Sequence, residues 1–235
     1  MKETHHDRPT ATTALLTLSH GSRHPEAAAN VMALTHAAGE LAGVPATAAH
    51  LEFNNPPLDE AARCLAAQGI REAVVVPLLF TEGYHQRIDV PEAVAQASSA
   101  SGVRLHQARG LGTGEDMARL LAERVPEGTD TVVLYSVGSS DERANAAVAG
   151  LARRVGELAG CTAKVAYATR GARQPVDSGG EQEVVVPLFV SPGLLLDRLD
   201  EDAGRSDGET RQILPPLGEA LAGIVSHRYA EVAHA

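Results

Sequence analysis

The segment ALLTLSHGSR, residues 14–23, decides the fold of the N-terminal half. It opens with an aliphatic run of strand length, and a His-Gly-Ser-Arg turn follows that run. An alanine-rich segment of helical period comes next, over 25–42, and a second strand-like run follows over 47–53. This alternation is typical of βαβ units and predicts a parallel sheet.

The alternation continues to about residue 125. Apolar runs predict further strands over 73–79 and near 103–107. Helical periodicity predicts further helices over 57–68, 89–100 and 113–125. The first half therefore holds four βα units.

The pattern then restarts in the second half of the chain. LLTLSHGSR at 15–23 aligns with VVLYSVGSS at 132–140. VVVPLLFTEGYH at 74–85 aligns with VVVPLFVSPGLL at 184–195. Self-similarity of this kind indicates a tandem of two homologous α/β units.

We predict an α/β fold of two homologous parallel-sheet domains in tandem, with the active site in the cleft between them. The N-terminal domain covers 14–126 and the C-terminal domain covers 127–235, after a disordered N-terminal segment over 1–13. The halves differ where chemistry would reside, because His20 aligns with Val137 and His85 aligns with Leu195. We therefore expect the N-terminal half to hold the chemistry and the C-terminal half to complete a cleft.

Composition limits the partners of the chain. The net charge is -10 and aromatic residues make up 3%, so we expect no nucleic-acid binding. No apolar run is long enough to span a membrane and the N-terminus lacks a signal-peptide pattern, so we expect a cytoplasmic protein with no membrane contact. The two cysteines form no CxxC motif, which fits a reducing compartment and offers no thiolate metal site.

His20 lies at the carboxyl end of the first strand, where open parallel sheets place their ligands. Gly21 permits a tight turn there, and Ser22 and Arg23 offer a hydroxyl, amide groups and a guanidinium to an anion. The alternative interpretation is that His20 caps a turn.

His85 follows the third strand, and Glu52 ends the second. Two imidazoles and a carboxylate on neighbouring strand ends predict a three-ligand site for a divalent metal. Strand alternation places His50 on the same face as Glu52. One of the two could therefore hydrogen-bond to a metal ligand instead of binding the metal itself. Glu52 could instead cap a helix or lie in solvent. Arg87, like Arg23, could bind a carboxylate or be a surface arginine.

Two other kinds of enzyme find little support. A P-loop is absent from the sequence, so nucleotide dependence is not supported. A serine hydrolase would use Ser19 or Ser22 with a histidine, but the sequence has no GxSxG motif and no identifiable triad aspartate.

The strand ending in HGSR, the Glu on the second strand and VPLLFTEGYHQRIDVPEA at 76–93 together resemble the sirohydrochlorin chelatase family of class II chelatases. The resemblance covers nearly the whole chain, because the long members of that family are also a fused tandem of two similar α/β halves. It implies a lyase that inserts Fe²⁺ or Co²⁺ into sirohydrochlorin without ATP. Fe²⁺ insertion in siroheme biosynthesis is favoured, and Co²⁺ insertion for cobalamin biosynthesis is the alternative.

The resemblance also implies roles for individual residues. His20 and His85 match the metal-binding histidines of the family, and Glu52 matches their acidic partner. Val137 and Leu195 depart from a symmetric arrangement, since neither can bind a metal. Fe²⁺ or Co²⁺ would be a substrate, and no tightly bound cofactor is expected.

Sirohydrochlorin is an anionic tetrapyrrole, so an acidic protein needs local donors for its carboxylates. We expect Gly21, Ser22, Arg23 and Arg87 to provide them. The internal tandem could close the cleft within one chain, which predicts a monomer. The remaining alternative is a carrier that binds the metal or the tetrapyrrole in the same cleft without turnover.

Overall fold

The computed structural model describes residues 13–81, 88–169, 182–203 and 211–234. In chain order, the elements of the first half are β1 (Ala14–Ser19), α1 (Ala27–Ala42), β2 (Ala46–His50), α2 (Leu58–Ala67), β3 (Glu72–Pro77), α3 (Val90–Ser101), β4 (Arg104–Gln107) and α4 (Glu115–Ala122). Those of the second half are β5 (Thr131–Ser136), α5 (Glu142–Ala159), β6 (Thr162–Tyr167), β7 (Glu183–Pro187), α6 (Leu194–Ala203), β8 (Arg211–Ile213), the 3₁₀ helix η2 (Gly218–Leu221) and α7 (Ala222–Ala233).

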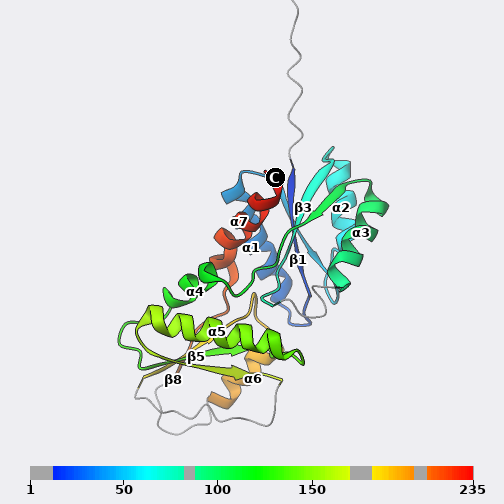
Figure 1. The fold of residues 1–235 in the computed structure, drawn as a ribbon. Coiled ribbons are helices and arrows are strands. Elements are labelled where there is room, and N and C mark those ends of the chain that lie inside the picture. The colour runs from blue at the N-terminus through cyan, green and yellow to red at the C-terminus, as the bar shows by residue number, and fades with distance from the viewer. Residues whose placement is uncertain (1–12, 82–87, 170–181, 204–210, 235) are drawn as a thin grey trace, which may run out of the picture.

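The strands form two parallel sheets with the same topology (Figure 1). The strand order is β2-β1-β3-β4 in the first sheet and β6-β5-β7-β8 in the second. The pairing register agrees as well: Ser19 pairs with His50, and Ser136 pairs with Tyr167. The predicted fold class, two parallel-sheet α/β units in tandem, is confirmed.

The first helix of each half packs very closely on the neighbouring strand. A Cβ atom added at Gly39 in α1 would lie 2.4 Å from the Cβ of Ala46. A Cβ atom added at Gly156 in α5 would lie 2.8 Å from the Cβ of Ala163. The two glycines occupy equivalent positions of the repeat. In each half, the close approach of helix and strand requires a residue without a Cβ atom.

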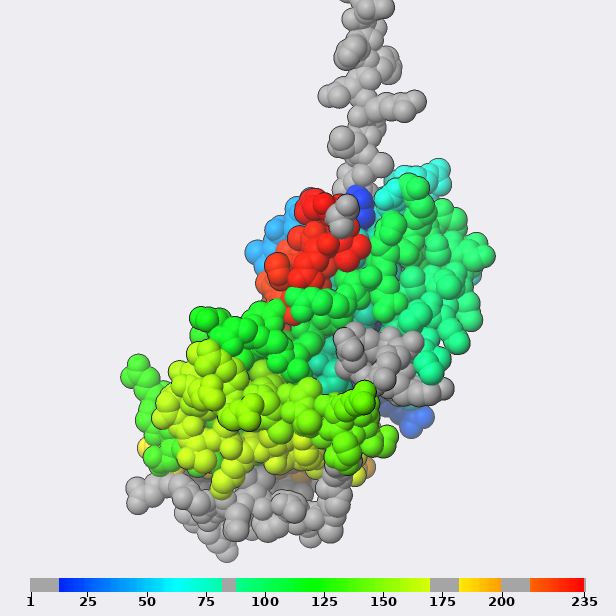
Figure 2. Space-filling model, in the orientation of Figure 1, coloured from blue at the N-terminus to red at the C-terminus, as the bar shows by residue number. Residues whose placement is uncertain are grey.

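The last helix of each half packs on the other half. Helix α4 packs on α5, whereas α7 returns to pack on α1 and β3. Figure 1 shows α7 beside α1, and the space-filling view in Figure 2 shows the red surface of α7 on the N-terminal half. One continuous hydrophobic cluster accordingly contains residues of both halves, among them Leu15, Val74, Leu134 and Val225.

Arg228 links these exchanged helices. Its side chain is fully buried and donates to the carbonyl oxygens of Gly110 (3.1 Å) and Leu111 (2.8 Å). It also donates to the carboxylate of Asp116 in α4 at 2.5 Å. The division of the sequence near residue 126 stays a prediction, and the packing shows that each half relies on a helix from the other.

Most predicted elements of the first half are confirmed, with one correction that affects the site. The second strand, predicted over 47–53, ends at His50. Phe53 has a φ of 62°, and Pro56 and Pro57 have no amide hydrogen for a strand ladder, so the chain leaves the sheet there. Helices predicted over 25–42, 57–68, 89–100 and 113–125 are found as α1, α2, α3 and α4.

Three predictions concern residues outside the described ranges. These are the disorder of the N-terminal segment 1–13, of which only Thr13 is described, and the roles of His85 and Arg87. Among the described helices, none is long and apolar enough to cross a membrane.

Candidate functional site

A cavity of about 480 Å³ lies between the two halves. Its walls include the segments that follow β1, β3, β5 and β7, with His20, Leu79, Val137 and Phe189 among the lining residues. All four segments leave the carboxyl ends of parallel strands. In both sheets the chain crosses from one side of the first strand to the other, and such switch points are where open α/β sheets bind ligands.

The turn after β1 forms one wall of the cavity and depends on Gly21. This residue has a φ of 94°, and a Cβ atom added to it would lie only 1.8 Å from the carbonyl oxygen of Glu52. Both the backbone conformation and the close approach therefore require glycine. The amide of Ser22 is not free for an anion, because it donates to Oδ1 of Asn54 at 2.8 Å.

The segment after β2 runs along this turn. The amide of Glu52 donates to the carbonyl oxygen of His20 at 2.9 Å. The amide of Asn54 donates to the carbonyl oxygen of Glu52 at 2.7 Å, which closes a three-residue turn around Phe53. The positive φ of Phe53 costs on the order of 1–2 kcal/mol for a residue with a Cβ atom.

The phenyl ring of Phe53 contacts two predicted site residues. The His20 imidazole meets it edge to face, with ring centroids 6.1 Å apart and an interplanar angle of 75°. The guanidinium carbon of Arg23 lies 4.7 Å from the centroid of the same ring. His20, Arg23 and Phe53 all line the cavity.

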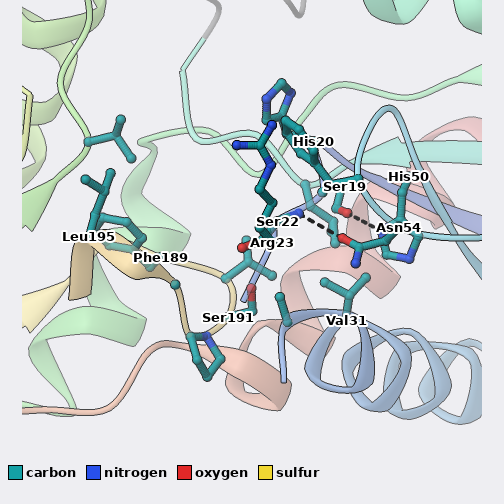
Figure 3. Close-up of a pocket in the computed structure, with 18 of the residues that line it drawn as sticks. Ser19, His20, Ser22, Arg23, Val31, His50, Asn54, Phe189, Ser191 and Leu195 are labelled. Carbon is teal, nitrogen blue, oxygen red and sulfur yellow. Dashed lines mark hydrogen bonds between the residues drawn. The ribbon is translucent and has the colours of Figure 1, made fainter. Parts of the chain in front are cut away.

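Ser19 and His50, also in the cavity lining, form a buried pair at the ends of β1 and β2. Ser19 Oγ and His50 Nδ1 share a hydrogen bond of 2.7 Å, drawn in Figure 3. Burial lowers the pKa of the His50 imidazole, which favours the neutral ring. Its Nε2 atom is buried and has no hydrogen-bond partner among the described residues.

The opposite wall is mostly apolar and comes from the second half. Val137, which occupies the place of His20 in the repeat, is 42% exposed and lines the cavity. Leu195 and Phe189 line it as well, and Figure 3 shows them across the cavity from His20 and Arg23. The Phe189 ring stacks on Tyr135, with centroids 5.7 Å apart, which supports this wall from behind.

The predicted metal ligands have different outcomes. His20 lines the cavity, whereas the Glu52 side chain is exposed and is not part of the cavity lining. Within the described ranges, no group of three or more His, Cys, Asp or Glu residues is placed to hold a metal ion. Because His85 lies outside those ranges, the site of His20, His85 and Glu52 stays a prediction.

Sequence reasoning missed the contributions of Phe53 and Asn54. In the sequence, Phe53 is typical of an apolar strand residue, and its residue type gives no indication of a positive φ. Asn54 stands in the Asn-Asn-Pro-Pro run at 54–57, which is a turn signal and could have suggested a side-chain acceptor near the turn.

Known sirohydrochlorin chelatases are similar to this chain in sequence. The chain is similar to the sirohydrochlorin cobaltochelatase of Sulfurisphaera tokodaii, with 42% identity over 77 residues, which span 33% of this chain and 62% of that protein. It is 25% identical over 235 residues to the sirohydrochlorin ferrochelatase of Priestia megaterium, covering 92% of this chain and 88% of that protein.

A solved structure has the same fold. The sirohydrochlorin chelatase SirB from Bacillus subtilis subspecies spizizenii, in complex with cobalt, superposes with a TM-score of 0.79. The match has 23% sequence identity and covers 95% of this chain and 96% of that one. The family model CbiX matches residues 14–128 and 131–232, one match in each half. The chain therefore belongs to the CbiX family of sirohydrochlorin chelatases.

Proposed function

We propose that this protein inserts a divalent metal ion into sirohydrochlorin without ATP. The observation that carries the proposal is the cavity between the halves, which has His20 on one wall and an apolar surface with Val137 and Leu195 on the other. The volume of about 480 Å³ is within the range of small-molecule sites.

The two walls suit different parts of the macrocycle. A tetrapyrrole has wide apolar faces, which the wall of Val137, Phe189 and Leu195 can cover. Its rim carries carboxylates, for which Arg23 provides a guanidinium at the cavity. Arg87 is proposed as a second carboxylate donor.

We assign His20 and His85 to the metal substrate, with Glu52 as a further ligand or as an acceptor of a pyrrole proton. Neutral imidazoles bind borderline divalent ions yet release them readily, as a delivery site requires. The hydrogen bond from the Glu52 amide to the His20 carbonyl oxygen holds the main chains of these two residues side by side. Insertion releases two pyrrolic protons, and a carboxylate near solvent can pass them on.

Fe²⁺ is the favoured metal, with Co²⁺ as the alternative. The relatives include proteins named for each metal, and His and Glu ligands suit both ions. We further propose that the protein is a monomer, since both walls of the cavity come from one chain.

The test is anaerobic absorbance spectroscopy of purified protein with sirohydrochlorin in large excess. Fe²⁺ and Co²⁺ are added in separate reactions, and the spontaneous rate of insertion is subtracted. Accelerated multiple turnover is expected, and the ratio of the two rates identifies the preferred metal. Tight binding of the macrocycle without acceleration by either metal would overturn the proposal and make the protein a carrier.

A further inference from the structure

We propose that Phe53 is a positioning residue. It holds the His20 imidazole in the position to bind the metal and the Arg23 guanidinium in the position to bind a carboxylate of the macrocycle. The inference rests on the proposed function for its kinetic consequences and on the geometry alone for its structural ones. The central observation is that one ring, at the cavity, contacts both side chains.

The two contacts are of kinds that orient side chains. An edge-to-face contact at 6.1 Å is a favoured arrangement of aromatic rings and restricts the rotation of the imidazole. A guanidinium 4.7 Å from a ring centroid makes a cation–π contact. A guanidinium stacked in this way keeps its N–H edge available for a carboxylate.

The backbone on either side of Phe53 places its ring beside His20 and Arg23. Hydrogen bonds from the Glu52 amide to the His20 carbonyl oxygen and from the Ser22 amide to Asn54 Oδ1 tie the turn after β2 to the turn after β1. Between these two ties, Phe53 has a φ of 62°, which glycine would adopt without strain. Strained residues of this kind gather at functional sites, where neighbouring contacts hold them.

Core packing does not account for the ring. Phe53 is 51% exposed and belongs to none of the hydrophobic clusters formed by the described residues. A large apolar side chain that is strained, half exposed and turned toward a cavity gains little from burial. The contacts with His20 and Arg23 supply the reason for a ring at this position.

Removal of the Phe53 ring should affect both KM and kcat. Loss of the ring frees Arg23, which weakens capture of a carboxylate and raises the KM for the macrocycle. It also removes the edge-to-face contact that orients the His20 imidazole, which lowers kcat for metal insertion. From the usual size of such contacts, kcat/KM should fall about tenfold.

The experiment compares three variants of the full chain. Phe53→Leu removes the ring, Phe53→Gly removes the ring and relieves the positive φ, and Phe53→Tyr keeps the ring. Leu41→Ala is the matched control, because Leu41 is an exposed apolar residue of α1 away from the cavity lining. We expect both ring-less variants to lose about tenfold in kcat/KM, Phe53→Tyr to retain the wild-type value, and Leu41→Ala to be unchanged.

A second readout does not depend on turnover. From the ring geometry, we expect the ring current of Phe53 to shift the NMR signals of the His20 ring protons in the metal-free protein. We expect these signals to move in Phe53→Leu and Phe53→Gly and to stay in place in Phe53→Tyr. Unmoved His20 signals in both ring-less variants, or wild-type kcat/KM in both, would overturn the positioning role. Absence of turnover in the wild type would instead refute the proposed function and leave the NMR result to decide on Phe53.

Discussion

His20 and Val137 occupy equivalent positions in the two halves and line the same cavity from opposite sides. Each directly follows the first strand of its sheet, after Ser19 and Ser136 respectively. The repeat therefore keeps the strand, the following glycine and the topology, and it changes the side chain that lines the cavity at this position. One half offers an imidazole and the other an apolar surface, which suits a ligand with a metal-binding centre and wide apolar faces.

The exchange of the last helices makes Arg228 important for the stability of both halves. We expect Arg228→Met to lower the free energy of unfolding by about 3 kcal/mol, because it removes the guanidinium that donates to Oδ2 of Asp116 and to the carbonyl oxygens of Gly110 and Leu111. Urea unfolding followed by circular dichroism measures this loss, and a single transition is expected because the halves share one core.

Arg109→Ala is the control for that variant. Arg109 also bridges to α7, through Glu231, but its side chain is 53% exposed, so we expect a loss of less than about 1 kcal/mol. Equal losses in the two variants, or separate transitions for the two halves, would contradict the importance of the buried link.

Gly21 should tolerate no side chain. We expect Gly21→Ala to cost about 2 kcal/mol or more, since the added Cβ atom would meet the carbonyl oxygen of Glu52 in addition to the strain of a positive φ. Gly43→Ala is the matched control: its φ is 68°, and an added Cβ atom would meet nothing within 4 Å. The control should lose only about 1 kcal/mol in thermal or urea unfolding. A Gly21→Ala variant as stable as the control would show that the turn after β1 and the turn after β2 are not packed against each other as described.

His50 should make stability fall in mild acid. Burial lowers the pKa of its imidazole below the usual 6.5, so the unfolded chain binds more protons than the folded one in the region just below that pH. The contribution of His50 is therefore fully present above about pH 6.5 and is lost as the pH falls through the lowered folded-state value.

The measurement is urea unfolding at about pH 7.5 and about pH 5.5. We expect His50→Gln to lose less stability than the wild type between the two conditions, while His36→Gln, at an exposed histidine of α1, behaves like the wild type. The same loss in all three proteins would exclude His50 as a source of the dependence.

Much of the fold could be predicted because it is local in the sequence. Strand-length apolar runs such as 14–19 and 131–136, separated by helical periods, indicate parallel βα units before any contact is known. The exchange of α4 and α7 could not be predicted. The apolar face of α7 shows that the helix is buried on one side, but it does not say against which sheet.

The site could be predicted only where residue type and position agree. A histidine at a strand end, as at His20, carries both kinds of information. The contribution of Phe53 depends on a backbone conformation that its residue type disfavours, so no sequence pattern indicates it. The pairing of His50 with Ser19 depends on the register of β1 and β2, which only the assembled sheet fixes.

The most direct test of the account compares metal insertion into sirohydrochlorin by His20→Ala and Val137→Ala under anaerobic conditions. If the N-terminal wall carries the chemistry and the C-terminal wall only holds the macrocycle, His20→Ala should retain its thermal stability and lose turnover. Val137→Ala should keep kcat and show a higher KM for sirohydrochlorin. Near-wild-type turnover by His20→Ala would contradict the account.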